Sequence, residues 1–394
     1  MVDYELAPEQ QDLRATVASF ARDVVAPVIG DYYERGEFPY DIVAGMGKLG
    51  LFGLPFPEEF GGMGGDFFTL CLAIEELARV DSSVAITLDA GVTLGAMPIF
   101  RFGTDEQRGR WLPALCAGER IAGFGLTEPD GGTDIPGTMR TTARLDGGEW
   151  VVNGTKAFIT NAGTSITSLV TVLALTGGEG GEGGEGGEGG ARENSTIVIP
   201  SGTAGFHPAP KYSKVGWCAS DTRELSFTDC RVPEENLLGE RGRGYAQFLR
   251  ILDEGRVAIS SLATGLAQGC VDECTRYANN RVSFGVPIGR HQAIAFKLAD
   301  MAARVHAARL AWYDAAARLV AGAPFKKEAA IAKLLASNAA MDNARDATQI
   351  FGGAGFMNES PVGRFYRDAK ILEIGEGTSE VQRMLIARSL GVSG

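Results

Sequence analysis

Glu376, near the carboxyl end of the chain, has the surroundings of a catalytic base. Glycines precede and follow it, so a ligand can approach its carboxylate closely. Ser379 and Gln382 have the spacing of a capping box, which predicts a helix that begins just after the glutamate. Such a helix end favours the ionised carboxylate. The alternative is a solvated surface glutamate, and the local pattern alone does not exclude it.

A second segment with possible chemistry is residues 125–137, which read GLTEPDGGTDIPG. Glycines let the backbone come close to a ligand, exposed N–H groups can form a concave anion site, and threonines add hydroxyl donors. This combination suits a phosphate group or a cofactor ring. The alternative is a polar turn that binds nothing.

A third segment, residues 150–163, carries an aromatic ring and a hydroxyl two positions apart, at Phe158 and Thr160. Side chains at i and i+2 of a β-strand point to the same face. Phe158 can therefore pack on a flat cofactor while Thr160 reaches its edge. Taken alone, an ordinary amphipathic strand is the better explanation.

A formal G-x-G-x-x-G match lies within the repeat GGEGGEGGEGGEGG at residues 177–190. A dinucleotide-binding turn of this kind needs a following helix, whose N-terminus meets the pyrophosphate. Here more of the repeat follows instead of a helix. The repeat therefore predicts a flexible, solvated loop.

Three parts of the chain must position these segments. Helical spacing of apolar residues predicts a helical domain over residues 1–121 and a second one over residues 239–394, with long amphipathic runs near 241–281, 289–322 and 326–350. Between them, residues 122–238 carry short β-branched and aromatic runs, which predict a β domain that contains the 177–190 loop. We interpret Asp146-Gly147-Gly148 and Asn153-Gly154 as turns of this domain.

The overall composition excludes several classes of protein. The 394 residues contain 37 basic and 49 acidic side chains, and the formal net charge of −12 argues against a nucleic-acid binder. Three histidines, and six cysteines without a Cys-x-x-Cys pair, predict that the protein holds no metal. The scattered cysteines are typical of reduced thiols in a cytoplasmic protein.

The amino-terminal residues contain no basic n-region and no apolar h-region, so we expect no secretory signal. The longest uncharged stretch, residues 157–178, is too polar for a membrane-spanning helix, so no membrane association is predicted. These features favour a cytoplasmic location, although a mature mitochondrial matrix form stays open.

Together the motifs resemble one family, the acyl-CoA dehydrogenases, which are flavoenzymes. The 125–134 segment meets the family pattern G-L-T-E-P-x-x-G-T-D with one extra residue, and EGTSEVQ at 376–382 is a second specific motif. Further matches are RVSFG at 281–285, HQAIAF at 291–296 and VGWCASDT at 215–222. The resemblance covers nearly the whole chain, as far as Arg388, and is closest in character to the short- and branched-chain members.

The resemblance implies an α+β multidomain fold: an N-terminal helical domain, a β-barrel-like middle domain and a C-terminal four-helix bundle. It also implies FAD, bound without a Rossmann turn, and a homo-oligomer, typically a tetramer built from two dimers. The residues that it assigns to the flavin are Phe124, Gly125, Leu126, Thr127, Gly132, Thr133, Phe158, Ile159 and Thr160, completed by Thr378 and Glu380. Those that it assigns to the adenosine and pyrophosphate, across a subunit interface, are Arg281, Ser283, Phe284, Gln292, Gln349, Gly352 and Gly353.

The implied reaction is α,β-dehydrogenation of an acyl-CoA thioester to the trans-2-enoyl-CoA. Glu376 would take the α-proton, and the β-hydrogen would leave as hydride to flavin N5. The weak acidity of the carbon requires hydrogen bonds to the thioester oxygen, which in this family come from the base's backbone N–H and a flavin ribityl hydroxyl. We expect exclusion of water by bound acyl-CoA to raise the pKa of Glu376, and the helix dipole to matter more in the free enzyme.

For the substrate, the resemblance implies contacts from Thr133, Asp253, Arg256, Gly375 and Gly377. The alternative for Arg256 is a surface ion pair with Asp253, three residues earlier on a helix.

Three positions depart from common family patterns. Some members carry their catalytic glutamate at the position of Gly255, which is vacant here, so the role stays with Glu376. Glu254 is adjacent but should point elsewhere, because one residue turns a helix by about 100°. Gly375 replaces a common tyrosine, which suggests room for a branched or wider acyl chain, and Phe158 replaces a common tryptophan.

The expected electron acceptor is an electron-transfer flavoprotein. One alternative is an oxidase-like flavoenzyme that passes electrons to oxygen. A second, from a different class, is a non-catalytic acyl-CoA-binding protein, which the presence of Glu376 and both flavin motifs disfavours.

Overall fold

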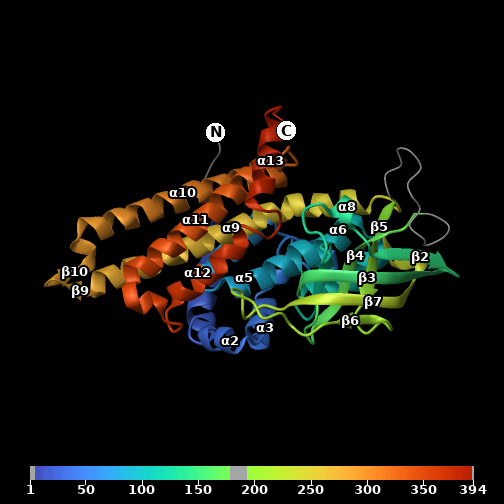
Figure 1. The fold of residues 1–394 in the computed structure, drawn as a ribbon, viewed down its shortest axis with the longest axis horizontal. Helices are drawn as coiled ribbons and strands as arrows, with labels where there is room; N and C mark the ends of the chain where they lie inside the picture. Colours follow the sequence, from blue (N-terminus) through green and yellow to red (C-terminus); the bar gives the residue numbers. More distant parts are fainter. Residues whose placement is uncertain (1–4, 178–192, 393–394) are drawn as a thin grey trace.

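The computed structural model describes residues 5–177 and 193–392, and it contains the predicted order of a helical part, a β part and a second helical part (Figure 1). The Gly/Glu repeat predicted as a loop lies, apart from Gly177, outside the described residues.

The N-terminal part is helical, and side-chain caps begin several of its helices. Asp66, Asp81 and Thr104 each accept a hydrogen bond from a backbone N–H in the first turn that follows. The elements are α1 (Pro8–Phe20), η1 (Ala21–Val25), α2 (Ile29–Arg35), α3 (Tyr40–Lys48), η2 (Leu51–Gly53), η3 (Glu58–Phe60), α4 (Phe67–Ala78), α5 (Ser82–Asp89), η4 (Ala90–Ala96), α6 (Met97–Phe102) and α7 (Asp105–Cys116).

The run Ser82–Phe102, which comprises α5, η4 and α6, is an interior segment of the fold. Among the described residues it is the one helix long and apolar enough to cross a membrane, and 89% of its most apolar window is buried inside the protein. Its middle portion, η4, is a π-helix, a rare form that is frequent at functional sites.

The middle part is one eight-stranded sheet. Its strands are β1 (Ile121–Gly125), β2 (Thr142–Asp146), β3 (Glu149–Thr160), β4 (Thr167–Leu175), β5 (Asn194–Pro200), β6 (Phe206–Pro208), β7 (Thr222–Pro233) and β8 (Leu237–Leu238). Their order is β6-β7-β3-β2-β4-β5-β8, and β1 pairs with β4 in parallel. A short helix, α8 (Ile135–Thr138), follows β1. The two segments with possible binding chemistry, residues 125–137 and 150–163, thus adjoin this sheet.

The prediction of a turn at Asn153-Gly154 is wrong, because both residues lie within the continuous strand β3. The register of β3 against β7 shifts between Val152 and Gly154, and the φ angle of Gly154 is 145°. A β-carbon on Gly154 would lie 2.7 Å from the Cα of Thr141, so glycine allows a bulge here rather than a turn. The predicted turn at Gly147-Gly148 does join β2 to β3.

The C-terminal part is built from long helices. Its elements are η5 (Glu234–Asn236), α9 (Gly244–Asn280), β9 (Val282–Ser283), β10 (Val286–Pro287), η6 (Ile288–Arg290), α10 (Gln292–Val320), α11 (Lys326–Phe351), η7 (Gly352–Phe356), α12 (Pro361–Leu372) and α13 (Ser379–Ser389). Buried alanines line the inner face of α11, which lets neighbouring helices approach closely. The β9–β10 hairpin lies at the opposite end of the long axis from the middle sheet (Figure 1).

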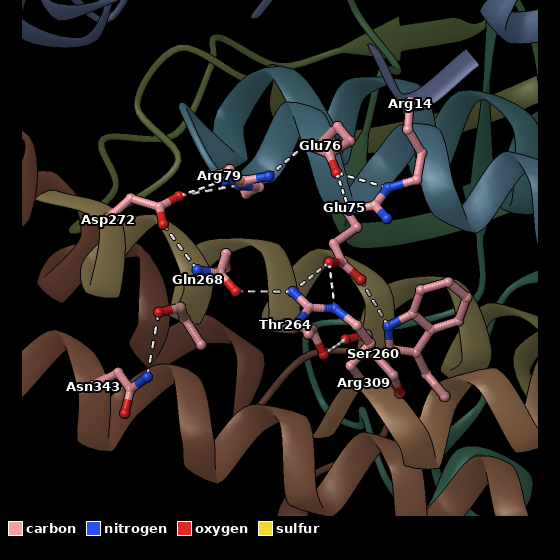
Figure 2. Close-up of polar contacts among 12 residues, drawn as sticks. Arg14, Glu75, Glu76, Arg79, Ser260, Thr264, Gln268, Asp272, Arg309 and Asn343 are labelled. Carbon is pink, nitrogen blue, oxygen red and sulfur yellow. Dashed lines mark hydrogen bonds and ion pairs between the residues drawn. The ribbon is translucent and has the colours of Figure 1, made fainter. Parts of the chain in front are cut away.

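Buried charges join α4 of the N-terminal part to the C-terminal helices (Figure 2). Glu75 accepts hydrogen bonds from Arg309 and from the indole of Trp312, both on α10. Its neighbour Glu76 pairs with Arg14 of α1 and with Arg79. Glu75 thus joins α4 to α10 of the C-terminal part, whereas Glu76 has its cationic partners within the N-terminal part.

Candidate active site

Glu376 lies in the short turn between α12 and α13, with a φ angle of 54° that L-residues seldom adopt. Thr378 caps α13 by accepting a hydrogen bond from the N–H of Val381, so the predicted capping box on Ser379 is wrong. Gln382 instead donates its side-chain amide to the carbonyl of Gly377. Helix α13 therefore begins one residue earlier than the Ser379 capping box predicts. Threonine can cap a helix as serine does, and here Thr378 takes that position.

The carboxylate of Glu376 faces Gly255 on α9. A β-carbon placed on Gly255 would lie 2.8 Å from Oε2 of Glu376 and 3.7 Å from Cδ2 of Leu94 on η4. The vacant helix position is therefore filled by the carboxylate from the C-terminal turn. Glu254, by contrast, points away and pairs with Arg101 at 3.1 Å, as predicted for the next residue of a helix.

Burial raises the pKa of Glu376 well above its ordinary value, and the carboxyl of Asp89 raises it further. Its Oε2 is shielded from solvent and has no hydrogen-bond partner among the described residues. The raised pKa of Glu376 does not require bound substrate, so burial already opposes its ionisation in the free protein. The sequence had predicted a larger influence of the helix dipole in that state. A carboxylate so placed is poised to take a proton.

Two cations flank the base and oppose this effect. Lys333 of α11 is buried and donates a hydrogen bond of 2.8 Å to the carbonyl of Gly377. Arg256 of α9 is 5% exposed, and its Nε atom has no partner. Both lower the pKa of Glu376, and burial lowers the pKa of Lys333 to about 8.

Arg256 forms the ion pair with Asp253 that was the alternative to a substrate contact, but the pair is largely buried rather than at the surface. Asp253 also lies 3.5 Å from the ammonium group of Lys326. Arg256 also lies close to the turn that carries Glu376, because a β-carbon on Gly377 would be 3.9 Å from its Nε. The substrate contacts of Asp253 and Arg256 stay predictions.

A cavity of about 60 Å³ lies where the N-terminal helices meet the middle sheet, and Phe158 and Thr160 both open onto it. It is lined by Ala90, Leu94, Ala122, Phe124, Phe158 and Thr160. Because Leu94 also contacts the region of Gly255, the cavity adjoins the base. The ring of Phe158 is 65% exposed, and Phe124 stacks on Phe248 of α9.

The glycine-rich segment after β1 is held to β3 by a buried ion pair. The ammonium group of Lys156 lies 2.8 Å from the carboxylate of Glu128 and donates a second hydrogen bond to the carbonyl of Leu126. Glu128 also accepts the backbone N–H groups of Arg140 and Thr141. The carbonyl of Thr127 accepts the N–H of Ala157. The segment is thus fixed beside Phe158, while its tip, including Gly132 and Thr133, is exposed.

Comparisons with known proteins match the chain along almost its whole length. Models of the acyl-CoA dehydrogenase N-terminal, middle and C-terminal domains match residues 7–119, 123–230 and 242–391. The probable acyl-CoA dehydrogenase YngJ of Bacillus subtilis (strain 168) is 44% identical over 99% of this chain and 100% of its own. The chain belongs to the acyl-CoA dehydrogenase family. The domain boundaries at residues 121 and 238 stay predictions.

Two solved structures have the same fold. Butyryl-CoA dehydrogenase from Megasphaera elsdenii is 39% identical, with a TM-score of 0.92 over 99% of this chain and 100% of its own. A chain in the structure described as "Electron transferring flavoprotein of Acidaminococcus fermentans: Towards a mechanism of flavin-based electron bifurcation" is 39% identical, with a TM-score of 0.93 over 99% of both chains.

Acyl-CoA dehydrogenases use FAD to dehydrogenate acyl-CoA thioesters, so this chain is an FAD-dependent oxidoreductase of that class. The residue types around the cavity suit one edge of a flavin ring, which a space of about 60 Å³ is too small to enclose whole: an exposed phenyl group, a hydroxyl and a small apolar wall occur together. Phe158 reaches this position through a positive φ angle of 62° at a bulge in β3. Ile159 points into the core of the sheet instead.

The second set of predicted FAD residues lies far from this cavity in the same chain. Arg281, Ser283, Phe284 and Gln292 surround the β9–β10 hairpin, at the opposite end of the molecule from the sheet (Figure 1). Gln349, Gly352 and Gly353 lie beside it, since Phe351 stacks on Tyr277 of α9 with ring centroids 4.1 Å apart. Phe284 is 94% exposed. One chain of this acyl-CoA dehydrogenase does not bring the two sets together.

Of the remaining predicted residues, Thr378 is the cap of α13 and Glu380 is exposed beside Arg383. Gly125 packs closely on β4, where a β-carbon would lie 3.1 Å from the carbonyl oxygen of Thr171. Gly375 has room for a side chain, because its nearest neighbour would be 3.4 Å away.

Sequence reasoning missed Asp89, Lys333 and the Glu128–Lys156 pair. Glu128 and Lys156 lie inside the two motifs that were singled out, so their opposite charges offered a usable signal. Asp89 stands alone in an apolar run, where an acid is unexpected unless it has a role. Lys333 has no comparable signal, because a lysine in an alanine-rich helix is ordinary.

Proposed function

We propose that Glu376 is the base that removes the α-proton of a short or branched acyl-CoA. The observation that carries this proposal is the buried Oε2 of Glu376, which has no partner and faces Gly255 beside the cavity. Two described acids have a buried carboxylate oxygen without a partner, Asp89 and Glu376, and of these Glu376 is the one that lies against Gly255. Glu254, the adjacent candidate, is ion-paired with Arg101.

The backbone around Glu376 also supports a role for its own N–H. Among the described residues, that N–H donates no hydrogen bond. The positive φ of Glu376 and the bonds from Lys333 and Gln382 to the Gly377 carbonyl fix the peptide groups of the turn. A fixed donor can stabilise the negative charge that develops on a thioester oxygen as the α-proton leaves.

Phe158 and Thr160 would hold the flavin ring, with Phe124, Gly125, Leu126, Thr127, Gly132, Thr133, Ile159, Thr378 and Glu380 in the surrounding segments. Bound FAD supplies the hydride acceptor for the β-hydrogen. The Glu128–Lys156 pair positions the segment that borders the ring, and the apolar residues Ala90 and Leu94 exclude water from the reacting carbons.

The preference for a short or branched acyl group rests on Gly375 and on the likeness to butyryl-CoA dehydrogenase. Without a tyrosine ring at position 375, width is available next to the base. Rates with butyryl-, isobutyryl-, isovaleryl- and octanoyl-CoA and an artificial acceptor test this. We expect the C4 and C5 substrates to react fastest, and a strict preference for octanoyl-CoA contradicts the assignment.

We also propose that two copies complete each FAD site. The support is the separation of the two FAD residue sets within one chain and the exposure of Phe284. The exposed hairpin of one copy would cover the adenosine and pyrophosphate held near the cavity of the next, in a dimer that pairs into a tetramer. Sedimentation of the holoenzyme tests this, and a monomer that retains FAD contradicts it.

An electron-transfer flavoprotein is the proposed acceptor, in a cytoplasmic setting. The likeness to the chain in the Acidaminococcus fermentans structure supports this choice. Peroxide release during turnover distinguishes the oxidase alternative: one peroxide per enoyl-CoA formed would favour oxygen. A purified protein with no flavin spectrum would favour the non-catalytic acyl-CoA-binding alternative.

A further inference from the structure

We infer that Asp89 is a positioning residue for the reaction: Asp89 and Glu376 act as one carboxyl pair that shares a proton, and Asp89 thereby sets the ionisation of the base. This inference rests on the proposed role of Glu376. It assigns to Asp89 a function that no motif of the sequence indicates.

Asp89 is a fully buried acid with half of its hydrogen-bonding capacity unused. It is the last residue of α5 and is 0% exposed. Its Oδ1 accepts a hydrogen bond of 2.9 Å from the hydroxyl of Thr93, whereas Oδ2 has no partner. Among the described residues no cation pairs with it. A buried carboxylate without a cation is costly, so a purely structural role is a poor explanation.

The position of Asp89 links it to the base. The π-helix η4 begins at the next residue, and its Leu94 lies against the Gly255–Glu376 contact. On its other side Asp89 faces α4, where the fully buried thiol of Cys71 has its pKa raised by burial and by the charge of Asp89. The charge of Asp89 thus acts both on the Cys71 thiol and on Glu376.

The charges that face Glu376 come from three elements. Asp89 of α5 raises the pKa of Glu376, while Lys333 of α11 and Arg256 of α9 lower it. Arg256 is already paired with Asp253, and Lys333 is bonded to the Gly377 carbonyl. Neither cation therefore neutralises the carboxyl pair by a direct ion pair.

Two buried carboxyl groups in one electrostatic field do not both ionise readily. Burial raises the pKa of Asp89 to about 7 and that of Glu376 well above its ordinary value. Near neutral pH the pair accordingly keeps one proton. When that proton resides on Asp89, Glu376 is the anion that can accept the α-proton, and both carboxyls are then protonated until the product leaves.

The test is the pH dependence of flavin reduction by butyryl-CoA, measured anaerobically from pH 5.5 to 9.5 with Asp89→Asn. Asparagine keeps the size of the side chain and removes its charge, so the pKa of Glu376 falls. We expect the acid limb of the rate profile to move to lower pH. The rate at pH 6 divided by the rate at pH 8.5 should be at least fivefold higher in Asp89→Asn than in the wild type. Thr87→Val is the matched control, because Thr87 is also buried on α5 but donates its hydroxyl to the carbonyl of Ser83 and not to Asp89, so no move to lower pH is expected.

A second readout does not depend on turnover. In the infrared spectrum of the substrate-free holoenzyme, titration should show protonated carboxyl bands that persist near neutral pH. Asp89→Asn should remove one band and lower the titration midpoint of the Glu376 band, which Glu376→Gln identifies. Asp89→Ser repeats both measurements in case the asparagine variant does not fold.

A uniform loss of rate at every pH in both Asp89 variants, with an unmoved Glu376 band, would overturn the carboxyl pair and indicate a packing role. Failure of the base assignment gives a different result, because Glu376→Gln would then keep its activity whatever the Asp89 variants do.

Discussion

The two ends of this acyl-CoA dehydrogenase chain are built in opposite ways. At the base end, Glu376, Gly255, Leu94 and the small cavity are enclosed by elements of all three parts of the same chain. At the hairpin end, Phe284 of the β9–β10 hairpin is 94% exposed, and Gly352 and Gly353 of η7 have open space around them. One end is enclosed within a single chain, and the other is exposed.

The difference indicates which properties depend on one chain and which on assembly. Ionisation of the base is set by groups of its own chain, since burial, Asp89, Lys333 and Arg256 all act on Glu376. In the proposed dimer, retention of the cofactor would depend on residues that this chain exposes, such as Phe284. Changes at the base end should therefore alter chemistry while FAD stays bound, and changes at the hairpin end should do the reverse.

Replacing Glu376 by glutamine should have the largest effect. Glutamine keeps the shape but cannot accept the α-proton, so we expect kcat to fall by about 10²–10⁴-fold with FAD content unchanged. Flavin absorbance and anaerobic bleaching by butyryl-CoA measure both. Turnover close to that of the wild type would remove Glu376 from the mechanism.

Gly255→Ala tests the close approach at the base end with a single methyl group. Because the new carbon would lie 2.8 Å from Oε2, the carboxylate must shift, and we expect kcat/KM to fall about tenfold. Gly109→Ala on α7 is the matched control, since no atom lies within 4 Å of its added carbon. Equal activities of the two variants would show that the carboxylate is free to move.

Phe284→Ala tests the hairpin end. If the ring stacks on the adenine of a neighbouring copy's FAD, its removal should raise the Kd for FAD about fivefold. The kcat of the fully loaded enzyme should stay unchanged. Equilibrium dialysis against FAD measures the Kd, and Phe356→Ala, which removes another exposed ring nearby, is the control. A lowered kcat with unchanged FAD affinity would reverse the assignment.

The melting temperature should also depend on the charge of Asp89, and this is the smallest of the expected effects. Its pKa in the folded protein is raised to about 7 from 3.8, so the stability it contributes is present at low pH and is lost as pH rises through about 7. The Tm of Asp89→Asn minus the Tm of the wild type should therefore be about 2 °C or more higher at pH 8.5 than at pH 5.5. Parallel Tm curves for the two proteins would show that Asp89 does not titrate in this range.

Much of the fold, and the candidate base Glu376, could be predicted from sequence because their signals are local. Apolar spacing predicted the long helices, and α9, α10 and α11 lie within a few residues of the predicted runs. Glycines around an acid before a helix marked Glu376. Local signals failed where neighbours distant in sequence decide the conformation: Asn153-Gly154 has turn residues, but pairing with β7 and the closeness of Thr141 make it a bulge.

The sequence by itself determined the family, the order of the parts and the residue types that a flavin and a thioester require. Only the tertiary structure decided the electrostatic setting of the base. Asp89, Gly255, Lys333 and Glu376 are far apart along the chain, and α5, α9 and α11 bring them together around one carboxylate. The strength of an acid depends on its burial and on charges within a few ångströms, and no spacing along a sequence specifies either.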